Sequence, residues 1–156
     1  MPFNWNDFIE IAQDIEQKDY MSANENGRYI EAYQRMMVVN LYYAVFNLSL
    51  QEVKRISSLL SEPDCQFIYN VTSVHGDVRR YFGKLSAIYR KNKEARLALN
   101  KLPEDLDSLH ELRKSCHYED AVNNLYSVCE EAMDLTLSIR ERLTKVTKAF
   151  ETKVDR

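Results

Sequence analysis

Two of the three histidines lie in one short stretch beside an arginine. On a helix, His110, Arg113 and His117 are spaced i, i+3 and i+7, which places them on one face. A histidine moves protons near neutral pH, and an arginine holds a phosphate group. These residue types in this pattern suit cleavage of an RNA phosphodiester, in which a base activates the 2′-hydroxyl and an acid protonates the leaving oxygen.

The same stretch also has a purely structural interpretation. Arg113 would then be buried in a pair with an acidic residue of another helix, while His117 and Tyr118 would only end their own helix. In the functional interpretation, Arg113 is partly exposed in a groove with His117 on the same side. The remaining histidine, His75, stands beside Gly76 at a predicted helix start, where a capping or packing role is expected.

Cysteine usage and the N-terminus bear on cofactors and compartment. Three cysteines are an odd count without a C-x-x-C pair, and together with the histidines they have no recognised ligand spacing. We therefore expect no metal and no other cofactor. Reduced thiols are usual in a cytoplasm. The N-terminal residues resemble no secretion signal, and the longest uncharged run, 36–51, is too short to span a bilayer. The expectation is a cytoplasmic protein without a membrane partner.

The composition favours helices. A chain of 156 residues predicts one domain over 1–156. Only three glycines and three prolines are present, which argues against turn-rich β folds. With 29% charged and 45% hydrophobic residues, the chain fits neither a disordered nor a membrane protein. We expect an all-α, up-and-down bundle of about five helices.

Apolar residues at steps of three and four predict where the helices lie. The predicted ranges are 6–20, 28–60, one that begins near 72 with its inner face over 81–89, 102–117, and 119 to past 150. Pro103 is expected in the first turn of the fourth helix. The fifth would be about 45 Å long, so residues 145–156 are expected to project as a helical tail. One core is expected to contain Tyr43, Phe46, Leu112 and Leu125.

A strongly basic window covers residues 79–101. It contains eight basic residues and one acid, so it carries +7 within a chain whose net charge is −3. Basic side chains on the outer face of a helix, among tyrosines, neutralise phosphates and stack on bases. The predicted RNA-binding residues are Arg79, Arg80, Lys84, Arg90 and Lys91. The alternative is a solvated face that attracts the acidic remainder of the chain within a dimer.

Three motifs resemble those of HEPN-domain proteins. Residues 35–46, RMMVVNLYYAVF, resemble their R-x(6)-YYA-x-F helix. Residues 73–78, SVHGDV, are similar to S-x-H-x-x-V, and residues 109–118, LHELRKSCHY, to L-x-x-L-R-x-x-x-D-Y with His117 in place of Asp. The opening, 4–12, is similar to the first helix of one prokaryotic branch. The motifs follow the family's order over most of the chain.

The resemblance implies an up-and-down helical bundle that is commonly dimeric. Many members are metal-independent ribonucleases of toxin–antitoxin, CRISPR-linked and other defence systems. Their catalytic pattern places four to six residues between Arg and His, whereas three separate Arg113 from His117. Arg113 carries over from the family motif, and His117 and His110 are candidates beside it.

Two hypotheses of different class follow. The first is an RNA-cleaving enzyme that uses Arg113 and His117 at the seam of a homodimer, with an antitoxin or a nucleotidyltransferase-type protein as partner. The second is a non-catalytic HEPN-like module that binds RNA, a nucleotide or a protein. The aromatic group Tyr42, Tyr43 and Phe46 is expected to pack in the core in both cases.

Overall fold

The computed structural model describes residues 3–17 and 30–151, and every regular element in these ranges is helical. The elements are α1 (Asn6–Gln17), α2 (Ile30–Leu59), the 3-10 turn η1 (Pro63–Cys65), α3 (Val74–Ile88), α4 (Lys93–Tyr118) and α5 (Leu125–Glu151). The expected all-α helical bundle is confirmed. The predicted helix ends at 18–20 and 28–29 lie outside the described residues.

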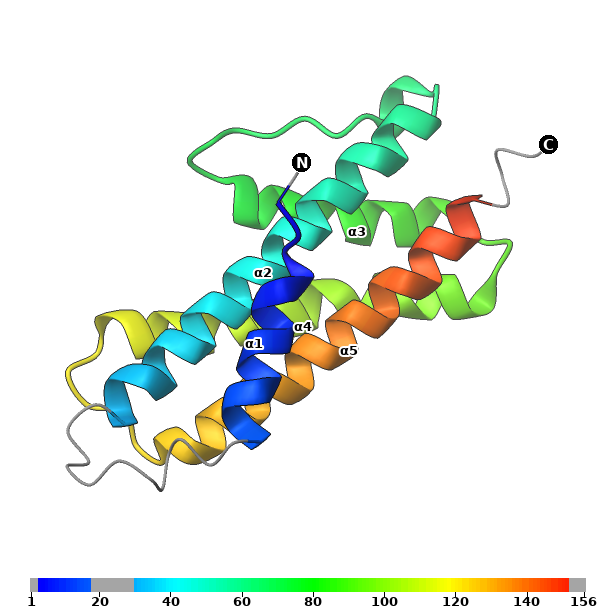
Figure 1. Cartoon of the computed structure of the whole chain (residues 1–156). Helices are drawn as coiled ribbons and strands as arrows, with labels where there is room; N and C mark the ends of the chain where they lie inside the picture. The colour runs from blue at the N-terminus through cyan, green and yellow to red at the C-terminus, as the bar shows by residue number, and fades with distance from the viewer. Residues whose placement is uncertain (1–2, 18–29, 152–156) are drawn as a thin grey trace.

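The second helix is the centre of the bundle. It packs against α1, α3, α4 and α5, and α4 packs along both α3 and α5 (Figure 1). Leu41, Ala44 and Val45 in its middle are completely buried, which explains why this stretch is apolar almost all round. The four residues expected in one core are found there, with Phe46 buried and the other three partly buried against it.

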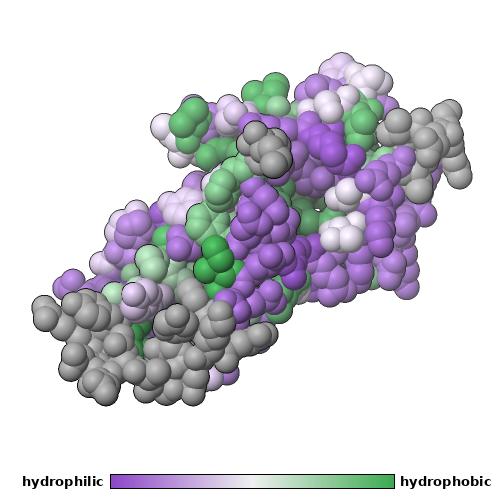
Figure 2. All heavy atoms as spheres, in the orientation of Figure 1, coloured by the Kyte–Doolittle hydropathy of each residue, from purple (hydrophilic) through white to green (hydrophobic). Residues whose placement is uncertain are grey.

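The surface is mixed in polarity. Figure 2 shows largely hydrophilic side chains along α5, whereas hydrophobic ones gather on the loop between η1 and α3. Ile68 and Val71 of this loop are largely exposed. Among the helices of the described ranges, none has the length and apolar character needed to cross a bilayer.

The fourth helix begins at Lys93, well before the predicted start at 102. Asn92 caps it, because its side chain accepts a hydrogen bond from the backbone N–H three residues on, at 3.1 Å. Pro103 therefore lies inside the helix. An interior proline costs about 3 kcal/mol, but each buried leucine contributes about 1.5–3 kcal/mol, so the packed stripe outweighs the proline. The buried leucines around the proline are Leu99, Leu102 and Leu106.

The fifth helix begins at Leu125, not at residue 119. The chain is not helical between α4 and α5, because the guanidinium of Arg35, on α2, donates hydrogen bonds to the end of α4 and to the turn after it. Its acceptors are the carbonyl oxygens of Cys116, Glu119 and Asp120, at 3.1, 2.7 and 3.2 Å. The turn closes at Asn124, whose φ of 51° is a left-handed conformation that asparagine tolerates.

The last turns of α5 do not project as predicted. Val146 and Phe150 are buried, and the ring of Phe150 packs on Tyr89 at the end of α3 with centroids 4.9 Å apart. The tail was predicted from helix length alone. The apolar residues of α5 are in fact buried against the other helices as far as Phe150. Residues 152–156 of the predicted tail lie outside the described part of the chain.

Candidate functional site

Three helices bring histidines, arginines and tyrosines into one cluster. Each helix contributes two residues; those of α3 and of α4 are four and three positions apart and share a face, whereas those of α2 are consecutive. This His–Arg cluster consists of Tyr42 and Tyr43 from α2, His75 and Arg79 from α3, and His110 and Arg113 from α4.

The imidazoles of His75 and His110 stack on each other and on Tyr42. Their ring centroids are 5.3 Å apart with planes 8° from parallel, and the ring of Tyr42 lies 4.9 Å from that of His110. The hydroxyl of Tyr42 lies 2.5 Å from Nδ1 of His75. Burial raises the pKa of Tyr42, so the hydroxyl keeps its proton and can donate a hydrogen bond to this nitrogen.

Both imidazoles are neutral at physiological pH. Burial, the neighbouring His75 and the charge of Arg79 lower the pKa of His110 to about 4. Burial, with the charges of Arg113 and Arg79, also lowers the pKa of His75. An uncharged imidazole accepts protons, and two of them beside guanidinium groups leave the cluster with positive charge only on its arginines.

Arg113 is a half-buried cation that no acidic side chain pairs with among the described residues. One terminal nitrogen donates to the hydroxyl of Tyr43, and the guanidinium carbon lies 5.1 Å from the ring centroid of that tyrosine. Its Nε is buried without a hydrogen-bond partner. The carboxylate pair of the structural interpretation is therefore not found, and the guanidinium retains donor capacity for an anion.

Arg79 turns into the cluster and not toward solvent as predicted. Its Nη1 lies 2.6 Å from a carboxylate oxygen of Asp107 and 3.5 Å from Nδ1 of His110. A shallow groove of about 450 Å³ between α3 and α4 reaches this ion pair from outside, past Arg80 and Gly83. Asp107 thus occupies the position that an incoming anion would take on Arg79.

His117 lies at the edge of the cluster, at the exposed end of α4. Its ring stacks on Tyr118 with centroids 4.6 Å apart, and Tyr118 in turn lies under the guanidinium of Arg113 at 5.5 Å. Of the three residues expected on one face, the structure therefore brings His110 and Arg113 into the cluster. His117 reaches Arg113 through the ring of Tyr118.

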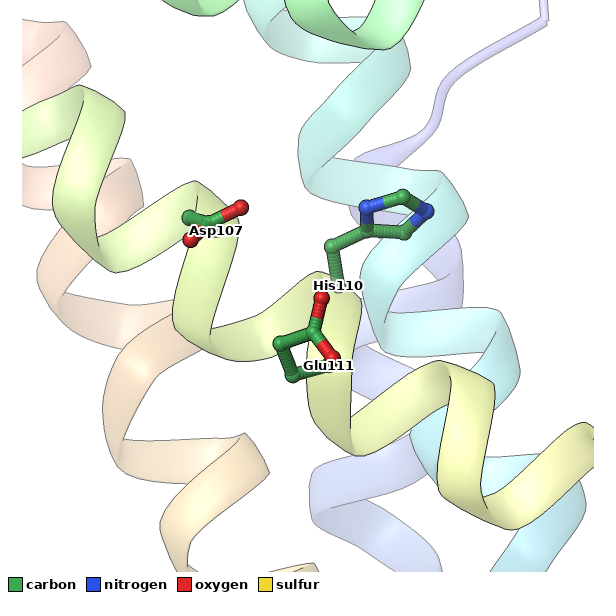
Figure 3. A group of neighbouring side chains, drawn as sticks. All are labelled: Asp107, His110 and Glu111. Atoms are coloured by element: carbon green, nitrogen blue, oxygen red, sulfur yellow. The ribbon is translucent and has the colours of Figure 1, made fainter. Parts of the chain in front are cut away.

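Within residues 3–17 and 30–151, one group of side chains has donor atoms for a metal. Those of Asp107, His110 and Glu111 lie within 4.8 Å of one another, and the imidazole points toward α2 (Figure 3). Each carboxylate already has a cation, because Arg79 binds Asp107 and Lys114 lies 2.5 Å from Glu111. A metal ion would have to displace both, so the group is better explained by its ion pairs.

The basic window is not one helical face. It runs from the second half of α3 through the turn 89–92 into the first turns of α4. Arg80 pairs with Asp77, and Lys101 with Glu104, so part of the +7 is neutralised locally. The basic residues of the window that are exposed and without an ion pair in the described chain are Lys84, Arg90, Lys91, Lys93 and Arg96.

Sequence reasoning assigned Tyr42 and Tyr43 to core packing and His75 to a helix start. Tyr42 is buried and His75 is the second residue of α3, so both assignments agree with the structure. The same side chains also contact His110 and Arg113, which the patterns did not indicate. The available signal was the hydroxyl groups themselves, since a buried tyrosine needs a hydrogen-bond partner.

Comparisons with models of protein families, with curated proteins and with solved structures give no match for this chain. The fold and the cluster together define an all-α helical protein with a histidine–arginine site between three of its helices.

Proposed function

We propose that the chain is a HEPN-like protein that binds a phosphate of RNA at the His–Arg cluster and cleaves the adjoining phosphodiester without a metal. The observation that supports this is Arg113, a half-buried guanidinium that lacks a carboxylate partner within the described residues and lies beside two neutral imidazoles. The guanidinium suits a phosphate, and the negative charge of a bound phosphate raises the pKa of His110 from about 4 toward the range in which an imidazole takes a proton from a hydroxyl.

In this proposal His110 takes the role that the sequence pattern gave to His117. His110 accepts the proton of the ribose 2′-hydroxyl, and the 2′-oxygen then attacks phosphorus. The bond to the 5′-oxygen breaks, and that oxygen takes a proton from solvent. Arg113 and Arg79 stabilise the added negative charge of the phosphorane, once Arg79 releases Asp107.

The setting proposed for this activity is a cytoplasmic toxin–antitoxin or other defence system. A homodimer with an antitoxin or nucleotidyltransferase-type partner belongs to the same proposal. Its support is the similarity of the three motifs to HEPN-domain proteins. Tyr33 and Met36, two large and exposed side chains on α2, offer apolar surface for such contacts.

A second candidate is a non-catalytic module that binds RNA, a nucleotide or a protein. The hydrogen bonding of the cluster favours it, because Nδ1 of His75 is engaged by Tyr42 and Arg79 is engaged by Asp107. An imidazole nitrogen and a guanidinium that already have partners are less available for proton transfer, but the cluster can still hold a ligand.

The test is cleavage of an end-labelled single-stranded RNA in the presence of EDTA. We expect products with 2′,3′-cyclic phosphate ends and no cleavage of the same strand with 2′-deoxyribose. Replacing a general base costs about 10²–10⁴-fold in rate, so His110→Ala should be nearly inactive, and Arg113→Ala should be as well because the phosphate loses its guanidinium. The matched variant His117→Phe, which keeps an aromatic ring but has no proton to transfer, should stay active. Binding without cleavage would favour the second candidate, and neither binding nor cleavage would refute both RNA proposals.

A further inference from the structure

The end of α4 presents an aromatic pair to solvent next to the His–Arg cluster. The rings of His117 and Tyr118 are stacked with planes 9° apart, and both residues are exposed, Tyr118 to 68%. The guanidinium of Arg113 lies over the ring of Tyr118. An exposed aromatic surface in contact with an arginine without a carboxylate partner in the described chain is the arrangement that single-stranded nucleic acids stack on.

The backbone that carries these rings is fixed. Arg35 binds the carbonyl oxygens of Cys116, Glu119 and Asp120, which flank Tyr118 on both sides. Arg35 is itself held by a salt bridge of 2.8 Å to Glu31. The rings are therefore exposed but pre-organised, and a ligand that stacks on them orders little additional chain.

We propose that His117 and Tyr118 form a stacking platform for an unpaired nucleobase whose adjoining phosphate is held by Arg113. This inference rests on the proposed binding of RNA phosphate at the cluster and adds the substrate class. The ligand is a single-stranded nucleotide, because a base must leave its helix to expose a face for stacking. In a nucleotide, a single ribose separates the base from its phosphate. In the protein, the guanidinium of Arg113 likewise lies next to the ring of Tyr118, so one nucleotide can contact both.

The test compares two probes of equal length and charge that this chain has no route to cleave. One is a 2′-O-methyl hexa-adenylate, and the other is an abasic hexamer with the same phosphates and the same 2′-O-methyl groups. Wild type should bind the base-bearing probe more tightly. Tyr118→Ala should weaken that binding about 5- to 150-fold, which is the range for loss of one base–aromatic stack, and leave the abasic probe unchanged.

Three further variants make the test specific. Tyr118→Phe keeps the ring and should bind within about threefold of wild type. Tyr69→Ala, at an exposed tyrosine of the loop before α3 (42% exposed), controls for the loss of a surface tyrosine and should bind as wild type does. Arg113→Ala should weaken binding of both probes, because both carry the phosphate. Thermal melts exclude variants that unfold.

The outcomes separate this inference from the proposed function. If Tyr118→Ala binds both probes as wild type does, or loses both equally, the platform is refuted while the phosphate site stands. If wild type binds both probes alike, the platform is refuted in the same way. If wild type binds neither probe, the platform and the proposed function fall together.

Discussion

Lowering the pH from 7 to 5 should destabilise the folded protein through His110. The pKa of this imidazole is about 4 in the folded chain and about 6.5 when it is fully solvated. Between these values the unfolded chain binds a proton that the folded chain does not. Stability is therefore full above about pH 6.5 and falls as the pH is lowered toward about 4.

The size of the effect follows from this difference in pKa. Linkage gives at most about 2 kcal/mol lost between pH 7 and pH 5, and solvent screening of this partly buried group reduces the expected loss to about 1 kcal/mol. His75 adds to it in the same direction, because its pKa is also lowered. The pKa values of Asp77 and Glu111 lie below their ordinary range, so their stabilising contributions are lost only at lower pH. Burial raises the pKa of Asp105, whose contribution has the opposite sign, so the imidazole is isolated by comparing wild type with a variant that lacks it.

The assay is urea unfolding, followed by circular dichroism, at pH 7, 6 and 5. Wild type should lose about 1 kcal/mol across the window, and His110→Gln should lose at most half of that. The slope is the readout, so any constant loss of stability in the variant does not matter. His117→Gln, which removes an exposed imidazole, is the control and should parallel wild type. A His110→Gln variant that declines as steeply as wild type would show that His110 is not held neutral by the fold.

Three more perturbations test the fold and its charged surface. Arg35→Met removes the hydrogen bonds that fasten the end of α4 and should lower the free energy of unfolding by about 2–4 kcal/mol in urea. Arg142→Ala leaves the buried carboxylate of Asp105 with only the more distant Lys101, at 3.9 Å, and should cost about 3 kcal/mol, part of which the double replacement with Asp105→Ala recovers. Lys84→Glu with Lys91→Glu should flatten the dependence of single-stranded RNA binding on salt, by about 0.7 in log–log slope per lost contact, with an unchanged dichroism spectrum. If the double variant has the same log–log slope as wild type, these two lysines do not contact RNA phosphates.

The helices themselves were readable from the sequence, because helical periodicity is a local property. The apolar run in the middle of α2 indicated a central helix, and α3, predicted to begin near residue 72, begins at Val74. Boundaries failed where a distant residue intervened. Pro103 looked like a first-turn proline, but burial of the leucines on both sides continues the helix through it. The end of α4 is held by Arg35, which is 81 residues earlier in the chain and therefore outside any local sequence pattern.

Half of the site followed from the same local rule. His110 and Arg113 are three residues apart on one helix, and the sequence placed them on one face. Their partners lie on other helices: Tyr43 bonds Arg113, and Tyr42 and His75 stack on His110. Sequence spacing carries no information on how α2, α3 and α4 are rotated against one another, and this rotation decides which faces meet. Because of this rotation, Arg79, predicted to be a surface cation, lies in the cluster, and His117 lies at its edge beside Tyr118.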